Sequence, residues 1–121
     1  MIDDIGKHDN KIANLIFSSV YPAYVAKVER KGRTVNELTQ VIKWLTGFTD
    51  RELKQAINGK ENFKELFERA TLNPNAHMIK GVICGYCVED IKNPLTQKIR
   101  YLDKLVDDLA KGKTIEKILK N

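Results

Sequence analysis

Residues 93–112 limit what the rest of the chain can fold into, because they carry its clearest amphipathic helix pattern. Their apolar residues recur at steps of four, three, four and three, which places them on one stripe of a 3.6-residue helix: Leu95, Ile99, Leu102, Val106 and Leu109. Tyr101 and Leu105 widen this stripe. The opposite side carries the charged residues Lys98, Asp103, Asp107 and Asp108. We therefore expect a helix over about 94–110 that the other elements surround.

Start and stop signals mark the ends of this helix and of shorter helices around it. Asn93 suits the N-cap, Pro94 the first helical position, and Gly112 the left-handed residue after a last turn. In a capping box, a side chain accepts from the amide three residues on and a glutamate reaches back. Such boxes are predicted at Thr34–Glu37, Thr49–Glu52 and Asn62–Glu65. Two further helix starts are predicted at Asn73-Pro74 and at Thr114.

Pro22 interrupts the helical pattern that begins near Asn10. A proline inside a helix costs about 3 kcal/mol, because it removes a hydrogen bond and its ring clashes with the preceding turn. We expect two helices here, one that ends near Val20 and one that begins near Pro22 and ends at Gly32. The alternative is one helix that kinks at the proline.

Residues 79–91 fit two kinds of secondary structure. Val82, Cys84, Tyr86 and Val88 alternate as in a strand, but the same segment also fits a helical period. A single strand would have no evident partner in this chain, whereas a helix can continue directly from Pro74. We expect a helix over 79–91, with a strand as the alternative.

The helix patterns above indicate an all-α protein, and the length indicates one compact domain. At 121 residues and 42% hydrophobic composition, the chain suffices for one modest core of six or seven short-to-medium helices. We expect a flexible arm over residues 1–9 and a single helical domain over 10–121. The chain has no apolar run that could span a bilayer and begins with a polar, acidic segment. We therefore expect a cytoplasmic protein that does not bind membranes.

The chain is basic at its two ends, and this excess suggests a binding surface. The formal net charge is +5, which attracts polyanions only weakly. Six cations and four carboxylates lie in residues 1–33, and eight and four lie in residues 92–121. A basic patch follows two tyrosines in the first of these regions. The candidate binding residues are Tyr21, Tyr24, Lys27, Arg30, Lys31 and Arg33. The alternative is that these cations complement a helix C-terminus and the tyrosine rings cover the core.

The only motif with reactive chemistry is Cys84-Gly-Tyr-Cys87. In thioredoxin-like sites such a pair lies between a strand and a helix N-terminus, which lowers the pKa of the first thiol. Here no βαβ pattern surrounds the pair, so the alternative is two reduced, buried cysteines. A structural zinc site would need a second pair of ligands that this motif lacks. We expect no metal site and no cofactor.

Four segments of the chain carry a resemblance to a known family: SVYPAYVAKVERKGRT, VIKWLTGF, NPNAHMIKGVICGYCVEDI and PLTQKIRYLDKLVDDLAKGKTIEKILKN. They resemble the bacterial family known as domain of unknown function 2200. The resemblance runs from about residue 12 to the end and implies a small single-domain bacterial protein. It implies no catalytic residue, ligand or partner. The family pattern carries arginine where this chain has Cys87, so the resemblance implies no role for the cysteine pair.

These features favour a non-enzymatic binding or assembly module that acts through protein contacts, either with itself or with another protein. The reason is that capping signals and packing faces are many, whereas reactive constellations are few. One alternative is weak binding of nucleic acid or another polyanion through the basic ends. The other is a thiol-redox protein that uses Cys84 and Cys87.

Overall fold

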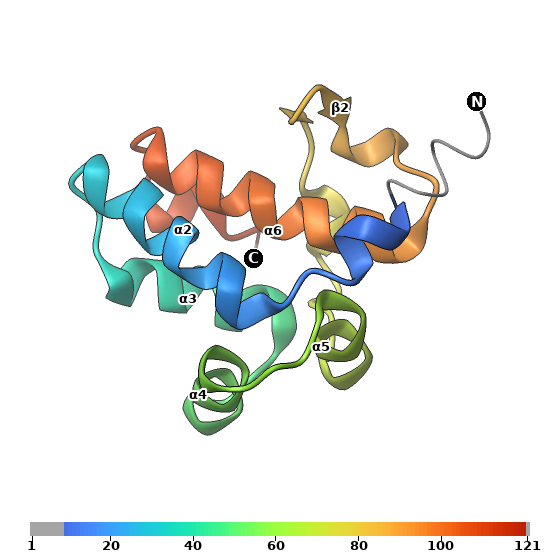
Figure 1. Cartoon of the computed structure of the whole chain (residues 1–121). Coiled ribbons are helices and arrows are strands. Elements are labelled where there is room, and N and C mark those ends of the chain that lie inside the picture. Colours follow the sequence, from blue (N-terminus) through green and yellow to red (C-terminus); the bar gives the residue numbers. More distant parts are fainter. Residues whose placement is uncertain (1–8, 121) are drawn as a thin grey trace.

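The computed structural model describes residues 9–120, and its elements are mainly helical (Figure 1). The helices are α2 (Phe17–Arg30), α3 (Val35–Thr46), α4 (Asp50–Asn58), α5 (Phe63–Arg69), α6 (Pro94–Ala110) and α7 (Ile115–Ile118). Residues 9–13 are also helical. The predicted all-α class is confirmed. The predicted arm over residues 1–9 lies outside the described residues except for Asp9, which accepts a hydrogen bond from the Thr96 hydroxyl.

Helix α6 lies at the centre of the fold, as its stripe predicts. Of the five stripe residues, four are buried, and Leu95 packs partly buried against the same core. The helix contacts α2, α3, α5, α7, and two of the short elements that precede it, Val82–Ile83 and Val88–Asp90. Burial of this stripe is the largest stabilising contribution that the sequence pattern predicts for the fold.

The side of α6 that carries the charged residues is also covered by protein, since Lys98, Asp103 and Asp107 are only partly exposed and Asp108 is buried. Asp108 and Lys104, which lies one turn earlier in the helix, are only 7% and 8% exposed. Lys104 Nζ lies 3.0 Å from Asp108 Oδ1, and Lys113 Nζ lies 3.6 Å from the same oxygen. Elements pack on this side of α6 too, and a buried carboxylate is tolerated there because cations pair with it.

The predicted helix starts are largely confirmed. Thr34, Thr49 and Asn62 each form a complete capping box, and Asn93 and Thr114 each cap a helix through the side chain. The exception is Asn73-Pro74. It leads only to a single 3₁₀ turn, η1 (Ala76–Met78), in which the Asn73 side chain accepts from the amide of Asn75.

The predicted break at Pro22 is wrong, because α2 continues through the proline. The chain breaks earlier, between residue 13 and Phe17. Pro22 lies in the second turn of α2, so it removes only the bond to the carbonyl of Ser18 near the helix start. Burial of Phe17, Tyr24 and Val28 on both sides of the proline stabilises the continuous helix.

The predicted helix over 79–91 is also wrong, and the strand alternative is closer. The segment forms an antiparallel hairpin of β1 (Val82–Ile83) and β2 (Tyr86–Cys87), followed by a 3₁₀ turn, η2 (Val88–Asp90). Cys84 and Gly85 form the two-residue loop with φ of 52° and 83°. Positive φ at both loop residues is typical of the type I′ hairpin turn. A right-handed helix cannot contain these conformations, so the turn overrides the helical period.

Gly81 brings the base of this hairpin against α6. Its φ is 117°, and a Cβ atom there would lie 2.9 Å from Cε of Lys104. Because Lys104 is buried and paired with Asp108, its side chain has little freedom to move away. By contrast, a Cβ at Gly85, where φ is also positive, would meet no atom within 4 Å.

We predict that Gly81→Ala destabilises the protein more than Gly85→Ala. Both changes impose backbone strain of about 1–3 kcal/mol, but only the first also displaces Lys104. Denaturant unfolding at equilibrium measures the two free energies. In a Lys104→Met background the excess cost of Gly81→Ala should fall. Equal losses for the two alanine variants would contradict a tight contact between the hairpin base and Lys104.

Candidate functional site

Helices α2 and α6 lie side by side and run in the same direction (Figure 1). The hydroxyl of Tyr24 donates to Asp103 Oδ1 at 2.7 Å. One turn further along both helices, Lys27 Nζ lies 3.1 Å from Asp107 Oδ1. Since the contacts advance together, the C-terminal ends of the two helices lie next to each other.

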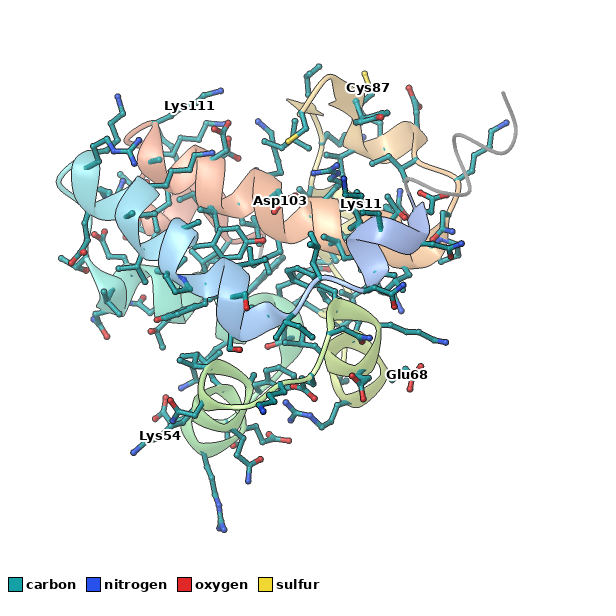
Figure 2. All side chains as sticks on the ribbon, viewed as in Figure 1. Lys11, Lys54, Glu68, Cys87, Asp103 and Lys111 are labelled. Carbon is teal, nitrogen blue, oxygen red and sulfur yellow. The ribbon has the colours of Figure 1, made fainter. Side chains whose placement is uncertain are left out.

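A groove of about 500 Å³ lies between these two ends. Helix α2 contributes Lys27, Arg30 and Lys31, and the end of α6 contributes Asp107, Ala110 and Lys111. The lining therefore holds four cations and one carboxylate. Figure 2 shows the Lys111 side chain extending from the end of α6 next to the end of α2. We call this feature the basic groove.

Asp107 holds two of the four cations. Its Oδ1 accepts Lys27 from α2, and its Oδ2 lies 2.9 Å from Nζ of Lys111. Burial would raise the pKa of Asp107, but hydrogen bonds from Lys111 and Lys27 outweigh burial and hold that pKa below its ordinary value. The other two cations, Arg30 and Lys31, are exposed. Within residues 9–120, neither has a carboxylate at ion-pair distance, so both are available to a ligand.

The structure places the two candidate tyrosines away from the basic groove lining. Tyr24 is buried, and its partner Asp103 also pairs with Arg100 Nη1 at 2.9 Å. Burial raises the pKa of Tyr24 well above its ordinary value, and the negative charge of Asp103 adds to this effect. Tyr21 packs its ring 5.9 Å from that of Phe17. The rings thus cover the core, as the structural alternative predicts.

Arg33 anchors the end of α6. Its Nη1 donates to the carbonyl oxygens of Leu109 at 3.1 Å and Lys113 at 2.6 Å. Its Nε and Nη2 donate to the carboxylate of Glu37. Hydrogen bonds from Arg33 and from Thr34 lower the pKa of Glu37 to about 2. With its donors committed to these partners, Arg33 is a structural residue that fixes the wall of the groove.

The two cysteines lie in the hairpin and are exposed with free thiols, which contradicts the expectation that they are buried. Cys84 occupies the turn, whereas Cys87 pairs in register with Val82, which is 58% exposed. A turn followed by a short strand differs from the strand-to-helix setting of thioredoxin-like sites. Over residues 9–120, the structure has no group of three or more His, Cys, Asp or Glu side chains that could hold a metal ion.

Sequence reasoning located half of the basic groove. It named Lys27, Arg30 and Lys31, but not Asp107 or Lys111. Two signals could have joined the halves, namely the cation excess at both chain ends and the similar helix endings Lys31-Gly-Arg and Lys111-Gly-Lys. Neither signal says that the helices pack in parallel, which is what brings the endings together.

None of the helices formed by residues 9–120 is long and apolar enough to cross a membrane.

Comparisons with known proteins give a family and a fold but no activity. A family model described as "Uncharacterized protein conserved in bacteria (DUF2200)" matches residues 11–120. Among solved structures, the crystal structure of the uncharacterized protein SP1917 is similar, with a TM-score of 0.85 and 42% sequence identity. The match covers 91% of each chain. No curated protein matches this chain.

We predict that Arg33→Lys lowers the free energy of unfolding by about 1–3 kcal/mol, because lysine cannot reproduce the planar fork that binds Glu37 and two carbonyls. Arg30→Lys is the matched control and should change stability by less than about 0.5 kcal/mol. Denaturant unfolding of both variants measures the difference. If both variants are as stable as the wild type, Arg33 is not an anchor.

Tyr24 should make stability fall at alkaline pH. Its folded-state pKa is raised, so the folded state keeps the proton while unfolded tyrosine begins to ionise near pH 10. Its contribution is therefore fully present below about pH 10 and is lost as the pH rises further. We expect Tyr24→Phe to flatten the decline in unfolding free energy above about pH 10. The control Tyr21→Phe should flatten it less, and equal slopes for Tyr24→Phe and wild type would refute the assignment.

Proposed function

The chain belongs to the bacterial family DUF2200, and we propose that it is a small non-enzymatic module that binds an acidic segment of another protein. The binding site is the basic groove. The observation that carries the proposal is the meeting of two helix C-termini, each bearing lysine or arginine, around a hollow of about 500 Å³.

Charge supports an anionic ligand. Arg30 and Lys31 project from the end of α2, and Lys27 and Lys111 lie on the two sides of the groove. A partly exposed ion pair contributes only about 0.2–1 kcal/mol. Useful affinity therefore requires several carboxylates on one segment, and binding should weaken as salt screens the charges. Oppositely charged surfaces also speed the association of the partners.

The groove lining favours an acidic peptide over nucleic acid. Single-stranded nucleic acids are usually held by cations together with aromatic rings on which the bases stack. The residues that line this groove are lysine, arginine, aspartate and alanine, and the candidate residue Tyr24 is buried outside the lining. A ligand recognised by charge alone fits this lining better. Duplex nucleic acid, recognised through its backbone, is the competing outcome of the test below.

We place this activity in the cytoplasm. The support is that Cys84 and Cys87 are free and exposed, a state that a reducing compartment maintains. A second copy of the chain could also supply the acidic segment, since α5 carries two exposed glutamates, Glu65 and Glu68. Self-association would then rise with protein concentration and fall with salt.

We predict that Lys31→Glu weakens binding of a fluorescent glutamate-rich peptide by about tenfold at low salt, since it replaces a groove cation by a repelling charge. Fluorescence anisotropy measures the affinity. Lys54→Glu is the matched control, because it changes the net charge equally and lies on α4, away from the groove (Figure 2). It should weaken binding by less than about twofold.

Three results would overturn the proposal. The first is no binding of the peptide by the wild type at low salt. The second is an equal loss of affinity in the two charge-reversal variants, which would indicate non-specific attraction. The third is tighter binding of a DNA duplex with the same dependence on Lys31, which would establish the polyanion alternative.

A further inference from the structure

Asp107 is the carboxylate in the lining of the basic groove. Its side chain is 14% exposed, and it lies between the ammonium groups of Lys27 and Lys111, which come from different helices. The two cations donate to different oxygens of this single carboxylate. Both are within reach of solvent, with side chains 41% and 64% exposed. The ion pairs can therefore be exchanged without opening the core.

We propose that Asp107 is a built-in competitor, which holds Lys27 and Lys111 until a carboxylate of the bound segment replaces it. This inference rests on the proposed function, because it concerns how the same groove is regulated. In the free protein the groove presents Arg30 and Lys31 first. The segment contacts these two exposed cations, and its next carboxylates then displace Asp107 from the two lysines.

Competition of this kind selects for ligands with several charges. Asp107 is tethered beside both lysines, so its effective concentration is high and a single free carboxylate displaces it poorly. A segment already held by Arg30 and Lys31 also presents its remaining carboxylates at high effective concentration. Acetate should therefore not bind, whereas a run of glutamates should. The groove therefore distinguishes ligands by the number of carboxylates that each ligand carries. A groove without Asp107 would distinguish them less sharply.

Asp107→Asn tests the inference. It removes the competing charge and releases both lysines, so the glutamate-rich peptide should bind about five- to tenfold more tightly than to wild type. Asp50→Asn is the matched control, since it also removes one carboxylate that pairs with a lysine, at Lys43 on another face. It should change affinity by less than about twofold. Asp107→Glu keeps the competing charge and should bind close to the wild type.

A second measurement on the wild type does not depend on how well the variants fold. The side-chain carboxyl carbon of Asp107, followed by NMR, should shift toward the position of an unpaired carboxylate as the peptide saturates the groove. Acetate at equal carboxylate concentration should cause no such shift. An unmoved Asp107 signal at saturation, or equal affinities of Asp107→Asn and wild type, would overturn the inference. The proposed function would survive that result, because it fails only if wild-type binding or its dependence on Lys31 is absent.

Discussion

Burial of α6 on almost every side is the constraint on which the rest of the structure depends. An amphipathic helix with one apolar stripe needs neighbours on that stripe alone, but here Lys104 and Asp108 on another side are buried as well. This arrangement is tolerated because these buried charges pair with each other and the buried Tyr24 hydroxyl also has a partner. Lys104 pairs with Asp108, and Tyr24 donates to Asp103. If one of these groups were buried without a partner, its loss of hydration would destabilise the fold by more than its burial stabilises it.

The packing of the other helices around α6 also determines which charged residues meet at the surface. Because α2 lies parallel to α6, the helix ends that carry lysine and arginine meet, and their cations lie near the partial negative charges of both C-termini. The arginine and lysine residues at the end of α2 fall into two groups according to their contacts. Arg33 is committed to Glu37 and to carbonyls at the end of α6, so it builds the groove wall. Arg30 and Lys31 are exposed and line the groove, which leaves them able to meet a ligand.

Local signals in the sequence predicted local structure well, whereas features set by tertiary packing were missed. The capping boxes and the α6 stripe depend on residues three or four positions apart, so the sequence contains all of their chemistry. Continuity through Pro22 depends on burial against other helices, which no local pattern encodes. The hairpin is different. Its turn residues, Cys84 and Gly85, both have positive φ. Cysteine is not among the residues expected at positive φ, so the pair does not indicate a turn in the sequence. For the site, the cations of α2 were found because they are contiguous, whereas Asp107 and Lys111 join them only through helix packing.

Amide hydrogen exchange under native conditions tests most directly whether α2 and α6 form one structural unit. The account predicts that the slowest amides of both helices, around Val28 and Leu105, exchange only through global unfolding. Their opening free energies should then equal each other and the free energy of unfolding measured by denaturant. If the amides of α2 open at a free energy lower by about 2 kcal/mol or more while α6 stays protected, α2 detaches independently. The groove would then not be a fixed feature of the fold.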